Sequence, residues 1–147
     1  MSKHRRLPDV DPLRLLAGLH GAVCAGTVAY WAGFMAGSIR TEESASYLDF
    51  ERSFQLADTY LATTSAAAAL ACWRRDQRAL PLGLMASSAS IYLGCMDVLY
   101  NVRHAKYRHV TPAMAVEIAI NAYSLVVSPL AAWTLWRQRD RLQPGNG

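Results

Sequence analysis

The sequence lacks charged residues over long distances. No Asp, Glu, Lys or Arg occurs in residues 15–39, 61–73 or 80–96 of the 147-residue chain. A helix at the surface of a soluble four-helix bundle carries a charged or polar stripe along the face that meets water. These three stretches have no such stripe, so the sequence argues against a soluble bundle.

Cysteine is scarce, and cofactor motifs are missing. Cys24, Cys72 and Cys95 are far apart in the sequence and form no Cys-x-x-Cys pair, so we expect small buried thiols and no redox centre. The chain contains no nucleotide-binding loop, internal repeat or low-complexity tract, and we expect no cofactor. The net charge of +4 comes from basic residues at predicted helix ends, so we expect no nucleic-acid partner.

Apolar residues make up 52% of the chain and gather in four stretches. Each stretch is near or above the roughly 20 residues that a helix needs to cross the hydrocarbon of a bilayer. The connections between them are short and polar, which favours antiparallel neighbours. The sequence therefore predicts an all-α protein, an antiparallel four-helix transmembrane bundle whose partner is the lipid bilayer. The expected helices are about 13–39, 54–73, 80–101 and 112–136, in one domain at 12–137 between tails at 1–11 and 138–147.

Basic residues are unequally distributed between the two ends of this bundle. Ten of the 15 Lys and Arg residues lie in the first tail, at the start of the first helix, in the turn at 74–78 and after the fourth helix at 137–141; the other five follow the first and third helices. Loops rich in Lys and Arg face the cytoplasm. We therefore expect a multi-pass protein of the bacterial inner (cytoplasmic) membrane with both termini cytoplasmic. The long connection at 40–53 is amphipathic, and we expect it to lie on the outer membrane surface.

Three carboxylates lie inside the predicted spans, all toward the outer end. Asp58 follows the start of the second helix, Asp97 precedes the end of the third, and Glu117 follows the start of the fourth. At about 1.5 Å per residue, each lies roughly 6–8 Å inside its helix end. Acids at membrane depth are costly and usually face a bundle interior or a wet cavity. The sequence therefore points to one site shared by three helices.

Polar and small residues extend from two of these acids along their helices. The third helix carries Ser87, Ser90, Gly94, Asp97 and Asn101 at helical spacing, and the fourth carries Glu117, Asn121, Ser124 and Ser128. Three acids at one depth cannot all remain ionised without compensation, which protons or a bound cation would supply. We predict binding of a small amphipathic or cationic ligand in an outward-facing polar pocket. The expected ligand-binding residues are Asp58, Tyr60, Asp97, Tyr100, Asn101, Glu117 and Asn121.

Other interpretations of the acids remain open at this point. Intramembrane polar side chains can simply join helices, at about 0.6–2 kcal/mol per contact. One neutral and one ionised carboxyl could also act as acid and base in an isomerase or similar enzyme. His104 and His109 follow Asp97 without the spacing of a metal motif, so we expect no metal site.

The first helix has a row of small residues at intervals of four: Gly21, Ala25, Ala29, Gly33 and Gly37. Such rows allow close approach of membrane helices. They predict a helix-packing face, which could serve other membrane subunits or self-association. The chain would then be an accessory or structural subunit of a larger membrane complex.

Two motifs carry a resemblance to a known group. Residues 54–61 read Phe-x-x-Ala-Asp-x-Tyr-Leu, and residues 92–107 read Tyr-Leu-Gly-x-x-Asp-x-x-Tyr-Asn-x-x-His-x-x-Tyr. Over the second and third helices the chain resembles a family of small four-helix bacterial membrane proteins, a family of uncharacterised activity. The four-helix plan with intramembrane acids is also similar in architecture to the EXPERA group, which includes sterol isomerases and sigma-2-like binding proteins. That likeness is an analogy of architecture and implies no catalytic residue here.

Overall fold

The computed structural model describes residues 11–39 and 44–142, and these residues form helices and turns without any strand. The all-α prediction is confirmed. The longer helices are α1 (Pro12–Met35), α3 (Gln55–Arg74) and α4 (Ala79–Arg103), and the shorter ones are α2 (Ala45–Ser53), α5 (Pro112–Ala122) and α6 (Ser128–Gln138). Short turns of other helix types lie at Lys106–Arg108 (η1), Tyr123–Val127 (η2) and Arg139–Leu142 (η3).

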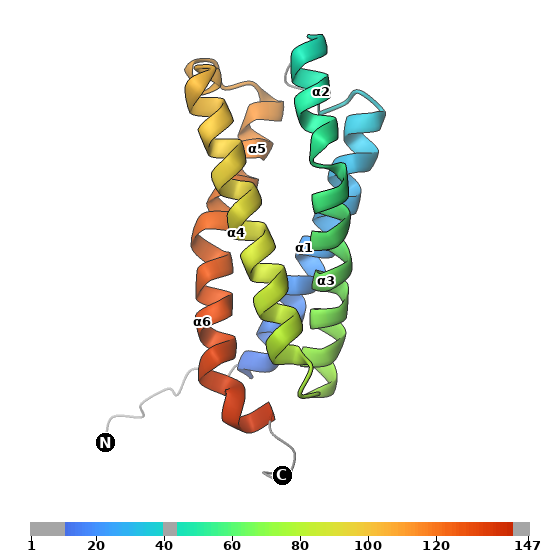
Figure 1. The fold of residues 1–147 in the computed structure, drawn as a ribbon, viewed down its shortest axis with the longest axis vertical. Coiled ribbons are helices and arrows are strands. Elements are labelled where there is room, and N and C mark those ends of the chain that lie inside the picture. The colour runs from blue at the N-terminus through green and yellow to red at the C-terminus, as the bar shows by residue number, and fades with distance from the viewer. Residues whose placement is uncertain (1–10, 40–43, 143–147) are drawn as a thin grey trace, which may run out of the picture.

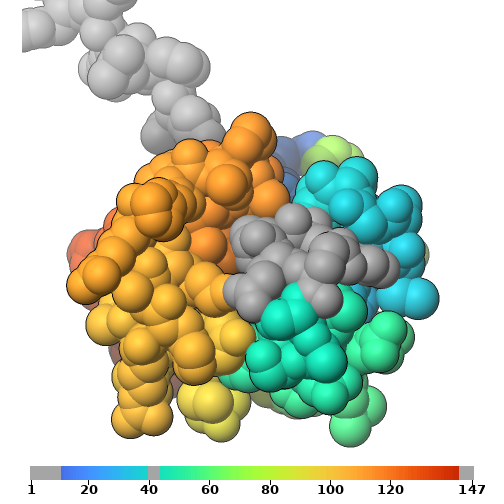
Figure 2. All heavy atoms as spheres, turned by 90° about the horizontal axis from the view of Figure 1, so that it is seen from above, coloured from blue at the N-terminus to red at the C-terminus, as the bar shows by residue number. Residues whose placement is uncertain are grey.

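These helices form four rods that run side by side (Figure 1). The first rod is α1, the second is α2 followed by α3, the third is α4, and the fourth is α5 followed by α6. Helix α1 packs on α3, α3 on α4, and α4 on α6. We call the end where α1 begins and α6 finishes the tail end, and the opposite end the far end. At the far end, the last turns of α1 and α4, helix α2 and the start of α5 surround the bundle axis (Figure 2).

The helix boundaries follow from capping residues. The Asp11 carboxylate accepts the backbone N–H of Leu13, and Pro12 occupies the first turn of α1, where no backbone donor is needed. Arg75 ends α3 in the left-handed region with φ 56°. The same Arg75 donates to Asp11 across 2.7 Å, which joins the start of α1 to the turn between α3 and α4. Thr111 caps α5 in the same manner as Asp11 caps α1.

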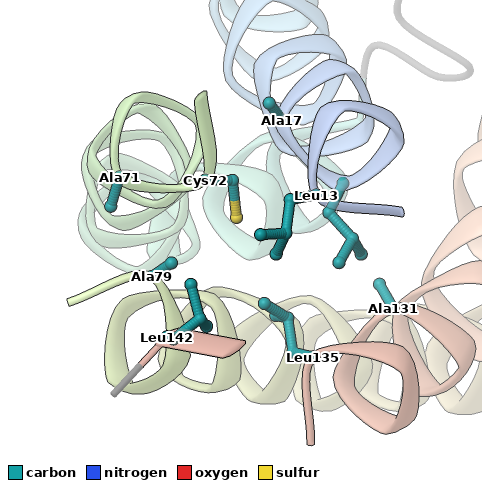
Figure 3. Close-up of a cluster of buried hydrophobic side chains, with 9 residues drawn as sticks. Leu13, Ala17, Ala71, Cys72, Ala79, Ala131, Leu135 and Leu142 are labelled. Carbon is teal, nitrogen blue, oxygen red and sulfur yellow. The ribbon is translucent and has the colours of Figure 1, made fainter. Parts of the chain in front are cut away.

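The tail end is closed by an apolar cluster drawn from all four rods. Leu13 and Leu16 of α1 meet Cys72 of α3, Ala79 of α4 and Leu135 of α6 (Figure 3). The cluster is completed by Ala17, Ala71, Ala131 and Leu142. It is the main cluster of buried apolar side chains in the described residues, and the buried polar side chains lie outside it.

Helix α2 differs from the sequence expectation. Residues 45–53 do not lie flat across the end of the bundle; α2 continues almost in the direction of α3 (Figure 1). Ser44 caps α2 by accepting the N–H of Tyr47, and the chain turns only slightly at Phe54. The side chains of Tyr47 and Glu51 are buried. The physical reason is that both side chains find hydrogen-bond partners inside the bundle, on α1 and α5.

The fourth rod is helical throughout but changes its winding in the middle. Residues 123–127 form a π-helical turn just before Pro129. Proline has no N–H to donate to the carbonyl four residues earlier, and its ring clashes with that carbonyl. A wider turn relieves this clash. The wider turn lies against α4 where Gly94 replaces a side chain. A Cβ at Gly94 would lie 2.6 Å from the Cβ of Ser124, so only glycine allows this approach.

Three helical segments are long and apolar enough to cross a membrane: Pro12–Met35, Ala79–Arg103 and Pro112–Leu142. The expectation of four such spans is therefore met only in part. Helix α3 falls short because its middle, residues 62–69, consists of Ala, Thr and Ser. Large apolar side chains such as Leu70, Val126 and Trp133 are exposed on the bundle surface, whereas Ser65, Asn101 and Glu117 are buried. This arrangement is compatible with a membrane protein, whose surface contacts lipid.

Candidate functional site

A cavity of about 600 Å³ lies between α1, α3, α4 and α5 in the far half of the bundle. Four carboxylates line it, and each comes from a different helix: Glu51 from α2, Asp58 from α3, Asp97 from α4 and Glu117 from α5. None of the lining residues that the structure describes is Lys, Arg or His. The site is therefore strongly acidic within the described part of the chain.

Asp97 and Glu117 are linked by two asparagine side chains. The Asn121 amide donates to Oδ2 of Asp97 across 2.6 Å, from α5 to α4. The Asn101 amide donates to the same Asp97 oxygen at 3.2 Å and to Oε2 of Glu117 at 3.4 Å. Asn101, Glu117 and Asn121 are buried. These hydrogen bonds join α4 to α5 at this level.

Aromatic side chains supply the hydrogen bonds to the other two carboxylates. The Tyr30 hydroxyl donates to Oε2 of Glu51 at 2.9 Å, and the indole N–H of Trp31 donates to Oδ2 of Asp58 at 2.9 Å. Both donors belong to the last turns of α1. In addition, the Tyr47 hydroxyl of α2 donates to Oε1 of Glu117 at 3.3 Å. Glu51, Asp58 and Asp97 therefore accept hydrogen bonds from neutral groups only, among the residues that the structure describes.

Glu51 belongs to the site although the sequence predicts it in a surface connection. A signal for it exists in the sequence: Tyr47, Glu51, Phe54 and Asp58 are spaced by four, three and four residues, the repeat of one helix face. Burial raises the pKa of Glu51 to about 7, since it disfavours the charged form. The hydrogen bond from Tyr30 acts in the opposite direction, and the nearby negative carboxylates add to the rise.

The structure places the predicted ligand-binding residues unevenly. Asp58, Asp97, Glu117 and Asn121 line the cavity. Asn101 is buried behind this lining, where it orients Asp97 and Glu117 as described above.

The two tyrosines predicted for the pocket lie elsewhere. The ring of Tyr100 stacks on Phe50 with centroids 3.6 Å apart, away from the cavity lining. Tyr60 is 45% exposed and lines a separate outer groove with Tyr92. Two residues of α-helix correspond to a rotation of about 200°. When Asp58 points toward the cavity, Tyr60 therefore points away from it. Tyr30 and Tyr123 line the cavity in their place.

The remainder of the cavity wall is largely apolar. Val23, Leu61, Leu93 and Ile120 contribute aliphatic side chains. At the bottom of the cavity Ser90 and Ser124 are hydrogen-bonded to each other at 3.2 Å. The cavity thus combines an acidic upper part with apolar walls, which suits a molecule that has both a charged and an apolar portion.

The row of small residues on α1 is mostly uncovered within the chain. Ala25, Ala29 and Gly37 are exposed, and a Cβ at Gly21 would meet nothing within 4 Å. Gly37 lies beyond the end of α1 with φ 77°, where its role is to turn the chain. The predicted packing face is therefore not an interface between the helices that the structure describes; near Gly33 lies Ile39, which follows α1 in the chain.

Comparison with known proteins adds no relative. The chain matches no known family, and no curated protein or solved structure is found to be similar to it. Among the residues that the structure describes, no three His, Cys, Asp or Glu side chains form a group that could hold a metal ion. The function must therefore be argued from the site itself.

Proposed function

We propose that the chain is an integral membrane protein whose cavity binds a small organic cation with an apolar body, such as a protonated amine. The observation that carries this proposal is the acidic cavity. Three carboxylates, Glu51, Asp58 and Asp97, have only neutral hydrogen-bond donors among the described residues. A bound cation would balance charge that these neutral donors cannot balance.

The walls support an amine rather than a simple ion. A volume of about 600 Å³ is within the range of small-molecule sites and far exceeds that of an inorganic ion. The four carboxylates come from four different helices and line a cavity of this size, so they surround a space instead of converging on one point. The Oδ1 atom of Asn121 is buried without a partner in the described structure and can accept an N–H from an ammonium group. The rings of Tyr30 and Tyr123 can contact the cation through their faces.

The membrane setting and the direction of the cavity are part of the same proposal. Three apolar segments and an exposed apolar surface support a bilayer environment. The excess of Lys and Arg at the tail end supports a cytoplasmic tail end. The cavity would then open on the outer side of a bacterial inner membrane.

The test is calorimetric binding of 2-phenylethylammonium to the detergent-purified protein at pH 8. The neutral isostere propylbenzene is the matched probe without charge. We expect the cation to bind and propylbenzene not to bind. Asp97→Asn should weaken cation binding about tenfold or more, equivalent to about 1.4 kcal/mol. Asp49→Asn is the control, since Asp49 is exposed on α2 and does not line the cavity.

Two outcomes would overturn the proposal. One is equal binding of the cation and propylbenzene, which would make the cavity a general apolar site. The other is equal loss of binding in Asp97→Asn and Asp49→Asn, which would show that the net charge of the protein, and not the cavity carboxylate, determines cation binding. Retention of the helical spectrum in both variants shows that each is folded.

A second candidate function is that of a subunit that associates through α1. It is favoured by Gly21 and Ala25 of α1: Ala25 is exposed and a Cβ at Gly21 would meet nothing within 4 Å, which leaves space for a close helix partner. Gly21→Leu with Ala25→Leu should reduce the oligomer measured by light scattering in detergent while the chain stays folded. An unchanged mass would show that lipid covers this row.

A further inference from the structure

A second group of polar side chains is buried below the cavity. His20 of α1, Ser65 of α3 and Ser87 of α4 are 4%, 0% and 2% exposed. The Nε2 atom of His20 and both hydroxyl oxygens have no hydrogen-bond partner among the described residues. A buried polar group without a partner costs about 1–3 kcal/mol. Three such groups in one small bundle need a common explanation.

The three side chains lie at one level of the bundle. His20 is eight residues from the start of α1, Ser87 is eight from the start of α4, and Ser65 is nine before the end of α3. All three helix termini are at the tail end (Figure 1). At about 1.5 Å per residue, each side chain is roughly 12–14 Å from that end. His20 also reaches toward α4, since its Nε2 would lie 3.2 Å from a Cβ on Gly83.

A chain of serine hydroxyls leads from this level to the cavity. Ser128 donates to Ser90 at 2.9 Å, and Ser90 donates to Ser124 at 3.2 Å. Ser90 and Ser124 line the bottom of the cavity whose upper part holds Asn121 and Asp97. Ser87 is one helical turn below Ser90 on the same face of α4. The unpartnered groups therefore continue a line of hydroxyls that begins at the bottom of the cavity.

On its tail-end side, this line of polar groups ends at apolar side chains. Below it lies the apolar cluster of Leu13, Leu16 and Leu135 (Figure 3). Among the buried residues of α3, α4 and α6, which pack around His20, only Cys72 can ionise, and it belongs to that apolar cluster. His20 is thus the one imidazole buried at this level in the described structure.

We propose that His20, Ser65 and Ser87 form a buried water-binding site, and that its water, with Ser128, Ser90 and Ser124, conducts protons between His20 and the acidic cavity. Buried water characteristically satisfies polar groups that lack protein partners. Each hydroxyl or water in such a line accepts one proton and donates another. A proton leaving a cavity carboxylic acid then arrives on the neutral ring of His20 and leaves a carboxylate behind. The proposal does not depend on which ligand the cavity binds.

The test follows His20 by NMR in detergent micelles. Substitution of His4, His104 and His109 by Gln leaves His20 as the only histidine, so that ¹⁵N-labelled histidine reports on it alone. We expect a cross-relaxation signal between the ring and long-lived water, and ring N–H exchange with solvent. Ser90→Ala should slow that exchange about tenfold or more because it removes the central hydroxyl of the line. Ser88→Ala is the matched control, since Ser88 is exposed on the same helix and its hydroxyl donates to the backbone carbonyl of Leu84.

Each result decides the proposal. Absence of a water signal at His20 in the background with unsubstituted serines would overturn the water site. Exchange that is equally fast in Ser90→Ala and Ser88→Ala would overturn the path through the serines. If Ser90→Ala fails to fold, Ser128→Ala is the alternative variant, since Ser128 is the next hydroxyl of the same line. It should slow exchange of the His20 ring N–H likewise. Cation binding plays no part in these measurements, so failure of the amine proposal would leave them unaffected.

Discussion

The Asn121 side-chain amide lies 2.6 Å from Oδ2 of Asp97, and this contact joins α5 to α4 at the acidic cavity. The same Asp97 oxygen accepts from Asn101, whose amide also reaches Glu117. Two carboxylates on different helices thereby share one set of donors. Removing the charge of either one changes the hydrogen bonding of the other, so the two acids should behave as a unit.

The first prediction concerns this coupling. Asp97→Asn and Glu117→Gln should not have additive effects on the free energy of unfolding, because Asn101 bonds to both residues. We expect a coupling energy of about 0.5–3 kcal/mol in a double-mutant cycle. The measurement is denaturant unfolding in detergent. As a control, Asp76→Asn with Glu117→Gln should be additive, since Asp76 lies in the turn at the tail end and pairs with Arg78.

The second prediction concerns the pH dependence of stability. The pKa of Glu51 in the folded protein is about 7, raised from 4.5. A carboxyl with a raised pKa binds its proton more tightly in the folded state, so its contribution to stability is fully present below about 4.5 and is lost as the pH rises through about 7. Protein without a ligand should therefore gain on the order of 1–3 kcal/mol between pH 8 and pH 5 from this group.

Glu51→Gln tests this dependence. The substituted side chain would keep an oxygen to accept from Tyr30 but could not titrate, so the stability of this variant should vary less with pH over this range. Asp49→Asn, on the exposed face of the same helix, should keep the full pH dependence. A Glu51→Gln protein whose thermal stability changes with pH as steeply as the parent's would contradict the assignment.

The third prediction compares two glycines. Gly94→Ala should destabilise the protein by about 1–3 kcal/mol, because the new Cβ would lie 2.6 Å from the Cβ of Ser124. Gly18→Ala should be neutral or stabilising by up to about 1 kcal/mol, since nothing lies within 4 Å and alanine favours helix. Both changes add one methyl group to a helix. Melting temperatures in detergent decide the comparison, and equal effects would place α4 and the π-helical turn further apart than in the structure.

The fourth prediction concerns orientation. With both termini cytoplasmic, a cysteine introduced in place of Gln77 should be labelled from the cytoplasmic side and one in place of Ser46 from the outer side. Both positions are exposed, at opposite ends of the bundle. In the background protein, Cys24, Cys72 and Cys95 are each replaced by alanine. In inverted and right-side-out vesicles, the reverse labelling pattern would show that the cavity faces the cytoplasm.

The helical class of the protein could be predicted from the sequence because hydropathy and helical spacing are local properties. The same spacing placed Asp97, Asn101, Glu117 and Asn121 on inward faces of their helices, and the structure has them joined. The starts at Pro12 and Pro112 likewise follow from capping residues beside them in the chain. These features need no knowledge of which helix lies next to which.

The remaining features were decided by tertiary contacts. The spacing of Glu51 and Asp58 puts them on one helix face, but Glu51 enters the site because α2 continues α3 and Tyr30 of α1 offers a donor, and both of these depend on packing. Tyr60 is excluded because the rotation of α3 is set by burial of Leu61, Ser65 and Ala68. Similarly, the cavity exists only because four rods of differing side-chain volume surround a space that their side chains do not fill. Local sequence determines which face of a helix is polar, whereas packing between helices determines which polar faces meet.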